Sequence, residues 1–357
     1  MMKSNKTHST TRIDLSNDFT KLLGCKYPII AGPMFLLSDE ALVIAACRAG
    51  IVGAYPALNW RTTEGFREAT RKIKSQIGGL PFAVNIIVNK SNIRVPADLR
   101  VCLDEGVPLF ITSLGSPKEV IAEAHKNGAK VFCDVTTLDY AKKVQDLGAD
   151  GVIAVSSGAG GHAGPISPMV LVPYLRKHLS IPVVAAGGIA SGRGLAAALV
   201  LGAAAAQIGT RFIASTECKA DQGYKNAILN ADPEDIVLTP KISGTPAAVI
   251  KTPYVEKLGL ELNVLEKLLL KDPRTKKWFK LLVSARGAKL LGDAAKKATW
   301  KEVWSAGQGV GLIDDIKTIQ EIVDELVDEC VKTLGGFCMP GGTSDAHTAK
   351  PQPNTSL

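Results

Sequence analysis

Residues 148–164 of this 357-residue chain read GADGVIAVSSGAGGHAG. The short apolar run Gly151–Val155 is followed by a glycine-rich loop that contains one histidine, His162. An unbroken apolar run of this length is typical of a strand buried on both faces of a parallel sheet. Glycines let a backbone approach a ligand closely, and histidine exchanges protons near neutral pH. The stretch indicates a bound cofactor beside a proton-transfer group, or else a tight turn with an exposed histidine.

The same order of elements recurs along the first two thirds of the chain. Glycines at 128, 148 and 202 end helix-like segments and predict left-handed caps before the next strand. About eight βα units in series predict an α/β fold of the (β/α)₈ barrel type, with a doubly wound open sheet as the alternative. The open sheet fits less well because its phosphate loop normally lies in the first unit. The predicted strands are Tyr27–Ala31, Gly50–Ala54, Phe82–Val88, Leu109–Ser113, Lys130–Val135, Gly151–Val155, Pro182–Ala186 and Ala205–Gly209.

The chain divides into four regions that differ in their pattern of apolar and polar residues. Residues 13–218 form the main part of the predicted barrel, and residues 219–303 read as a lysine-containing helical lid with no strand rhythm. Residues 304–336 combine a second glycine-rich loop with a helix that is expected to complete the outer ring. The polar ends, 1–12 and 339–357, are expected to be disordered. The clearest helices of the lid are Glu261–Leu270 and Trp278–Leu291, and the last helix is expected over Ile316–Leu334.

Composition limits the class of protein. The chain is 46% hydrophobic, but it has no uninterrupted apolar run long enough to span a membrane, and its polar start lacks the core of a secretion signal. A soluble, cytoplasmic protein is expected. Seven scattered cysteines without a CxxC pair argue against a disulfide framework and a metal site. The net charge of +8 suits phosphorylated cofactors or acidic carrier proteins, and without a recognition motif it does not indicate a nucleic-acid partner.

The candidate site lies at the carboxyl ends of the strands, because the loops there build the active sites of such barrels. Barrels often bind phosphate with the loops after their last two strands. Gly187-Gly188 and Gly209-Thr210 are therefore expected to offer backbone N–H groups and the Thr210 hydroxyl. A helix beginning near Ser191 is expected to add a favourable dipole. Tight turns without a ligand are the alternative.

Six segments together resemble the nitronate monooxygenase family, formerly called 2-nitropropane dioxygenases, and the related flavin-type enoyl-acyl-carrier-protein reductases. No single segment is specific, but the set spans residues 22–335. The segments are Pro28–Met34, Phe82–Asn85, Ala159–Gly164, Pro182–Ile189, Gln207–Phe212 and Ala306–Gly311.

The resemblance implies FMN in a barrel with a helical lid, a small-molecule substrate such as a nitronate, and O₂. It implies that His162 lies beside the flavin ring, as a base toward a nitroalkane or as a group that orients a nitronate. Gly160 belongs to the same loop. The family's flavin contacts would fall on Gly32, Pro33, Met34 and Asn85, and its phosphate contacts on Gly161, Gly187, Gly188, Gln207, Gly209 and Thr210.

Departures from the family pattern keep the substrate open. Asp134 takes a strand end where some relatives have a lysine near the flavin ring, and a carboxylate there disfavours negative charge on reduced flavin. Asp134 is otherwise a structural hydrogen-bonding residue. Gly158 stands where the carrier-protein reductases often have an acidic residue. The alternatives are an NAD(P)H-dependent flavin reductase acting on enoyl thioesters or quinones, and a non-catalytic flavin- or phosphate-binding barrel.

Overall fold

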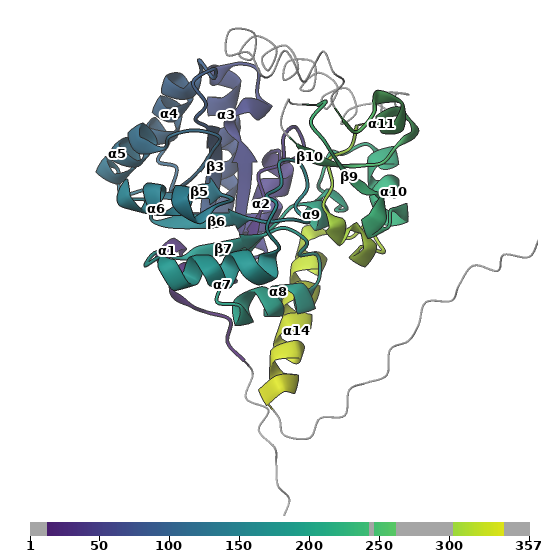
Figure 1. The fold of residues 1–357 in the computed structure, drawn as a ribbon. Helices are drawn as coiled ribbons and strands as arrows, with labels where there is room; N and C mark the ends of the chain where they lie inside the picture. Colours follow the sequence, from purple (N-terminus) through teal and green to yellow (C-terminus); the bar gives the residue numbers. More distant parts are fainter. Residues whose placement is uncertain (1–12, 243–245, 262–302, 339–357) are drawn as a thin grey trace, which may run out of the picture.

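The computed structural model describes residues 13–242, 246–261 and 303–338 (Figure 1). Eight parallel strands form a closed barrel in the order β1 to β8. Closure is made by β8, which pairs with β1 at Gln207 and Ile30 and so excludes an open sheet. The predicted (β/α)₈ barrel is confirmed. The strands are β1 Ile29–Ala31, β2 Val52–Pro56, β3 Phe82–Ile87, β4 Leu109–Ser113, β5 Lys130–Val135, β6 Gly151–Val155, β7 Val183–Ala186 and β8 Ala205–Ile208.

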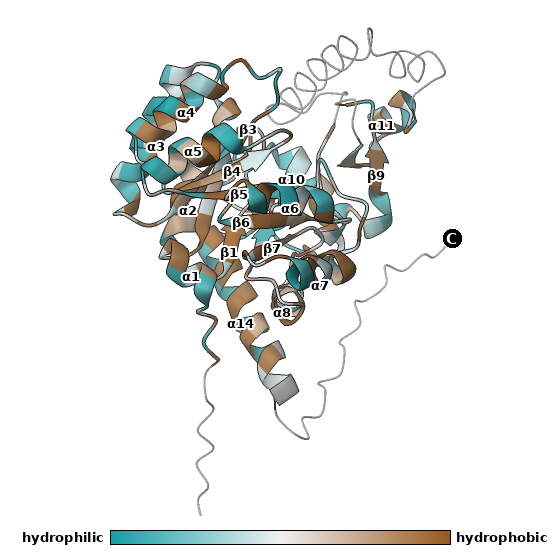
Figure 2. Ribbon diagram, turned by 60° about the vertical axis from the view of Figure 1, so that its left-hand side comes forward, coloured by the Kyte–Doolittle hydropathy of each residue, from teal (hydrophilic) through white to brown (hydrophobic). Residues whose placement is uncertain are grey.

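Helices surround the strands and turn their apolar sides inward (Figure 2). The glycines that end three of them have φ angles of 72° at Gly128, 93° at Gly148 and 93° at Gly202, which confirms the left-handed caps. The helices are α1 Asp18–Leu23, α2 Glu40–Arg48, α3 Thr63–Ile77, α4 Val95–Asp104, α5 Lys118–Lys126, α6 Leu138–Asp146, α7 Pro168–His178, α8 Gly192–Val200, α9 Thr210–Ile213, α10 Gln222–Asn230, α11 Pro253–Leu258 and α14 Ile319–Cys338, with short 3₁₀ turns at η1 Ala57–Asn59, η2 Pro233–Asp235 and η3 Gln308–Leu312.

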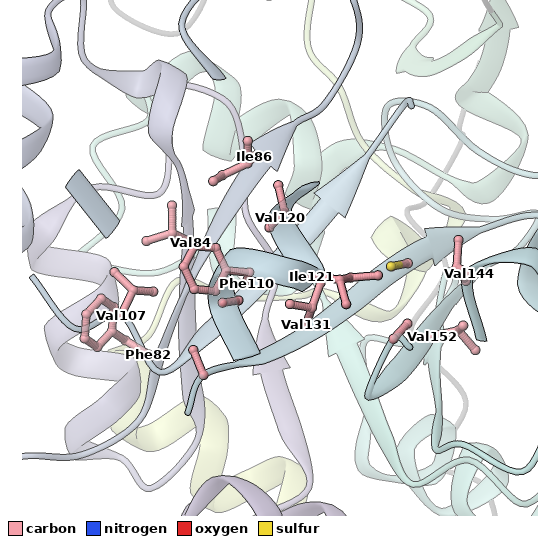
Figure 3. Close-up of a cluster of buried hydrophobic side chains, with 14 of the residues drawn as sticks. Phe82, Val84, Ile86, Val107, Phe110, Val120, Ile121, Val131, Val144 and Val152 are labelled. Carbon is pink, nitrogen blue, oxygen red and sulfur yellow. The ribbon is translucent and has the colours of Figure 1, made fainter. Parts of the chain in front are cut away.

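Strand residues alternate between the barrel interior and the helical layer. On β5, Val131 and Cys133 pack in the outer cluster, whereas Phe132 belongs to the inner one. Figure 3 shows the outer cluster, in which Val131 lies near Val120 and Ile121 of α5. The same alternation places the last inward residues of the strands at the carboxyl end of the barrel.

The segment after the barrel contains strands as well as helices. β9 (Ile236–Thr239) and β10 (Ala247–Ile250) form an antiparallel pair beside α10 and α11 (Figure 1). The expectation of a lid without strands is wrong here. Both runs are short and rich in β-branched or small apolar residues, and a segment with Pro and Gly joins them, which is a hairpin signal. Apart from Glu261, the two predicted lid helices lie outside the described residues, as do both tails.

The last helix, α14, begins at Ile319 and packs against α8 and α2. It approaches α8 closely, because a Cβ on Gly192 would lie 2.4 Å from the Leu326 carbonyl oxygen. This helix therefore lies beside α8 and α2 of the helical layer. None of the helices described is both long and apolar enough to cross a membrane.

Candidate active site

Three polar side chains extend the barrel interior at the ends of β3, β4 and β5. The Asn85 Nδ2 group donates to the Ile111 carbonyl oxygen at 3.1 Å and to Ser113 Oγ at 2.7 Å. Ser113 Oγ in turn donates to Asp134 Oδ2 at 2.6 Å. The predicted site residues Asn85 and Asp134 are therefore joined through Ser113. Ser113 is absent from the predicted site, although its position two residues after inward-facing Ile111 was a usable signal.

Asp134 is an unusual member of this chain of hydrogen bonds. Its second oxygen, Oδ1, is buried and has no hydrogen-bond partner among the described residues. Burial raises the pKa of the Asp134 carboxyl to about 6, and the hydrogen bond from Ser113 opposes that shift. A carboxylate normally accepts several hydrogen bonds, so this group is poorly solvated in its charged form.

Gln207 of β8 brings a second buried acceptor to the same end of the barrel. Its Oε1 atom also lacks a hydrogen-bond partner among the described residues. Gly32 lies beside it, since a Cβ on Gly32 would be 3.4 Å from Gln207 Cγ. A Cβ on Gly209 would be 3.7 Å from Met34 Sδ. The predicted residues Gly32, Met34, Gln207 and Gly209 are thus neighbours, and Pro33 lies in the same turn as Met34.

The turn after β1 is fixed by two residues that the predicted site does not include. Ser38 Oγ accepts from the Met34 N–H at 2.9 Å and donates to the Gly32 carbonyl oxygen at 3.1 Å. Asn59 Oδ1 accepts from the N–H of Leu36 at 2.8 Å, and Leu36 has a φ of 62°. A positive φ is strained for a residue other than glycine, and such strain persists only where the surroundings fix the backbone. The hydrogen bonds of Ser38 and Asn59 fix it here.

The loop that carries His162 is held on both sides. Gly161 and Ala248 of β10 exchange two backbone hydrogen bonds, of 3.1 and 2.7 Å. The Gly158 carbonyl oxygen accepts from the N–H groups of Gly188 at 3.1 Å and Gln308 at 3.0 Å. The β9–β10 pair and the second glycine-rich loop therefore both form part of the site.

Thr210 connects the last strand end to this assembly. Its Oγ1 accepts from the Gly307 N–H at 3.0 Å. Gly307 must be glycine, because a Cβ there would lie 2.4 Å from the Gly158 carbonyl oxygen. Gly160 is crowded by the same loop, because a Cβ there would lie 2.9 Å from the Ala306 carbonyl carbon. The loops after β6, β7 and β8 are thus joined into one unit.

His162 remains accessible to solvent at this end of the barrel. The surrounding protein still removes enough water to lower the pKa of the His162 imidazole below its usual value. Burial disfavours the charged imidazolium, so the neutral ring predominates at pH 7. A neutral imidazole can accept a proton, which suits a general base.

Two glycines of the site border open space, and a third does not. Gly161 and Gly188 have φ angles of 68° and 70°, and a Cβ on either would meet nothing within 4 Å. A Cβ on Gly187 would lie 2.8 Å from Ser156 Oγ. Gly161 and Gly188 therefore offer bare backbone faces that a ligand can approach closely.

Some of the donors predicted for an anion are already engaged. The Gly188 N–H donates to Gly158, as described above. The Gly192 N–H at the start of α8 donates to Glu329 Oε2 of α14 at 2.6 Å, and the Gly194 N–H donates to Ser191 Oγ at 3.2 Å. α8 does begin after Ser191, as expected, and the Glu329 carboxylate of the chain itself lies at this helix start.

A family model described as nitronate monooxygenase matches residues 92–329. The chain belongs to the nitronate monooxygenase family. The predicted resemblance is confirmed, and the protein is an oxidoreductase of a flavin-dependent family.

Similar proteins carry several different names. A (3aS,4S,5R,7aS)-5-hydroxy-7a-methyl-1-oxo-octahydro-1H-indene-4-carboxyl-CoA dehydrogenase from Rhodococcus jostii is 30% identical, over 90% of this chain and 97% of its own. A nitronate monooxygenase from Paraburkholderia phytofirmans is 32% identical, over 62% of this chain and 73% of its own. FabK from Thermotoga maritima has a TM-score of 0.77 at 32% identity, covering 90% of this chain and 98% of FabK. Nitroalkane oxidase from Streptomyces ansochromogenes has a TM-score of 0.72 at 27% identity, covering 88% and 99%.

The residues present fit a flavin, the cofactor expected of this family. Two buried acceptors without partners, Asp134 Oδ1 and Gln207 Oε1, can each receive a hydrogen bond from a bound group. The flavin ring system carries an N–H donor and several acceptors, which suits this mixed polar layer. The bare faces of Gly161 and Gly188 leave room for close approach of a large ligand.

Proposed function

We propose that this protein is an FMN-dependent oxidoreductase that oxidises alkyl nitronates, or the nitroalkanes from which they form, with O₂. The observation that carries the proposal is the placement of a neutral His162, on a loop clamped between β10 and the second glycine-rich loop, beside the bare faces of Gly161 and Gly188. This arrangement would hold a base where a bound flavin and a carbon acid meet.

The flavin would be held from two sides. The turn of Gly32, Pro33 and Met34 and the polar layer of Asn85, Asp134 and Gln207 would contact the ring. Gly160, Gly161, Gly187, Gly188, Gly209 and Thr210 would surround the phosphate side, where Gly188 contributes open space rather than a free donor. When bound, the flavin supplies the redox chemistry, and the chain supplies position and electrostatics.

His162 would serve the substrate in either of its protonation states. As a neutral base it takes the proton from the carbon next to a nitro group. Once protonated, it donates a hydrogen bond to the anionic nitronate and keeps it oriented. Because the pKa of His162 is lowered, activity toward nitroalkanes is expected to persist to slightly acidic pH, until the ring becomes charged.

The experiment attempts to reduce the purified flavoprotein under anaerobic conditions. The readout is the loss of the flavin absorbance. Bleaching by propyl-2-nitronate without a response to NADH or NADPH supports the proposal, and bleaching by NADPH alone contradicts it. His162→Ala is expected to keep FMN and lose at least 100-fold in kcat/KM, in line with the loss of a general base. His125→Ala on α5 is the matched control, and unchanged turnover in His162→Ala would exclude the base.

A second candidate is oxidoreduction of an acyl thioester. It is favoured by the relative from Rhodococcus jostii, because 97% of that protein aligns with this chain and its name specifies a carboxyl-CoA substrate. Bleaching of the flavin by an acyl-CoA, or reoxidation of reduced flavin by an enoyl-CoA, would identify it. A flavin that responds to none of these compounds would leave a binding barrel without catalysis.

A further inference from the structure

We propose that Asp134, held by Ser113 and Asn85, is a positioning residue that takes up a proton when the bound flavin is reduced and thereby tunes the redox potential of the flavin. The inference rests on the proposed flavin site. It goes beyond it by assigning a coupled proton to a named carboxyl group.

The hydrogen bonds around Asp134 suit a neutral carboxylic acid better than a carboxylate. Only Oδ2 receives a hydrogen bond, from Ser113, and buried Oδ1 receives none among the described residues. A protonated Oδ1 would instead donate to an acceptor of a bound ring. Ser113 cannot turn away freely, because its oxygen also accepts from Asn85 at 2.7 Å.

No cation balances Asp134 within the described part of the chain. On β4 and β3 it faces the neutral Ser113 and Asn85, as shown above. On its own strand Cys133 is neutral, since burial raises the pKa of that thiol to about 12. On α6, Tyr140 is also neutral and donates to the Gly115 carbonyl oxygen. The pKa of His162 is shifted by burial and not by Asp134.

Because no cation among the described residues screens Asp134, a negative charge on a nearby bound flavin will shift its pKa strongly. Reduction adds two electrons to the flavin, and one proton binds to the ring itself, so one negative charge remains. That charge raises the pKa of Asp134 above its starting value of about 6. Between the two pKa values a second proton moves from solvent to Asp134 Oδ1, and no other bond changes. The proton and the electrons thus stabilise each other's binding.

The test is the midpoint potential of the FMN-loaded protein as a function of pH, measured with dithionite and reference dyes. Between the two pKa values of Asp134, an interval that begins at about pH 6, the wild-type slope is expected to be twice that of Asp134→Asn, because two protons rather than one accompany two electrons. Asp139→Asn, which removes an exposed acid on α6, is the control and should keep the wild-type slope. Equal slopes in wild type and Asp134→Asn overturn the inference.

A second variant extends the test, and a second readout makes it independent of flavin retention. Ser113→Ala removes the hydrogen bond that lowers the pKa of Asp134, so the steep part of the curve should move to higher pH. An unmoved curve contradicts the inference. In the flavin-free protein, infrared difference spectra should show a carboxylic acid band that titrates near pH 6 and is lost in Asp134→Asn. Failure of all variants and wild type to bind FMN would instead refute the proposed flavin site.

Discussion

The two sides of the barrel's carboxyl end differ in the groups that line them. β3, β4 and β5 end in polar side chains, Asn85, Ser113 and Asp134, which are joined by hydrogen bonds. β6, β7 and β8 end in glycine-rich loops, whose backbone is fixed by Gly158, Ala248 and Gly307. Side chains allow the chemistry of a bound ring to be tuned, whereas bare backbone allows close approach. In the proposed function, the first side would tune the cofactor and the second would hold it.

The largest expected effect tests the backbone side. Gly187→Ala places a Cβ 2.8 Å from Ser156 Oγ at a φ of 122°, and should lower the free energy of unfolding by about 3 kcal/mol. Gly188→Ala borders open space at a φ of 70°, and should cost only about 1–2 kcal/mol while weakening FMN binding. Urea unfolding and FMN titration of both variants measure the contrast, and equal stability losses would contradict it.

A smaller effect tests the side-chain side. In the flavin-free protein the pKa of Asp134 is raised to about 6, so the folded state holds this proton more tightly than the unfolded chain does. This contribution to stability is complete below about pH 4 and is lost as pH rises to 6, by about 2–3 kcal/mol. Asp134→Asn should therefore be more stable than wild type at pH 7, and its advantage should vanish near pH 4. Chemical unfolding at both pH values measures this, and an advantage independent of pH would point to packing instead.

The smallest effect concerns the turn that joins the two sides. Asn59→Ala removes the acceptor for the Leu36 N–H and should cost about 1 kcal/mol in the free energy of unfolding. The Met34 turn should become less fixed, which would raise the Kd for FMN by a few fold. Asn127→Ala, at the exposed end of α5, is the control, and an effect of equal size there would remove the special role of the turn.

Much of the barrel could be read from the chain because its signals are local. The bounds of β4, β5 and β6 agree with the predicted runs. β2 begins two residues later than predicted, because the Gly50 carbonyl oxygen accepts from the N–H groups of Lys26 and Tyr27 in a turn. The β9–β10 pair was missed because its two runs are only four residues each and lie among helical patterns.

The sequence by itself determined the eight βα units, the glycine loops and the single histidine within them, because strand length, helix periodicity and left-handed glycine caps act over a few residues. Only the tertiary structure decided which groups meet. In the folded chain Ser113 joins Asn85 to Asp134 by hydrogen bonds. Glu329 accepts from the N–H group at the start of α8. The His162 loop lies between β10 and the loop of Gly307. Hydrogen bonds between distant residues form only after the barrel has closed, so no local pattern records them.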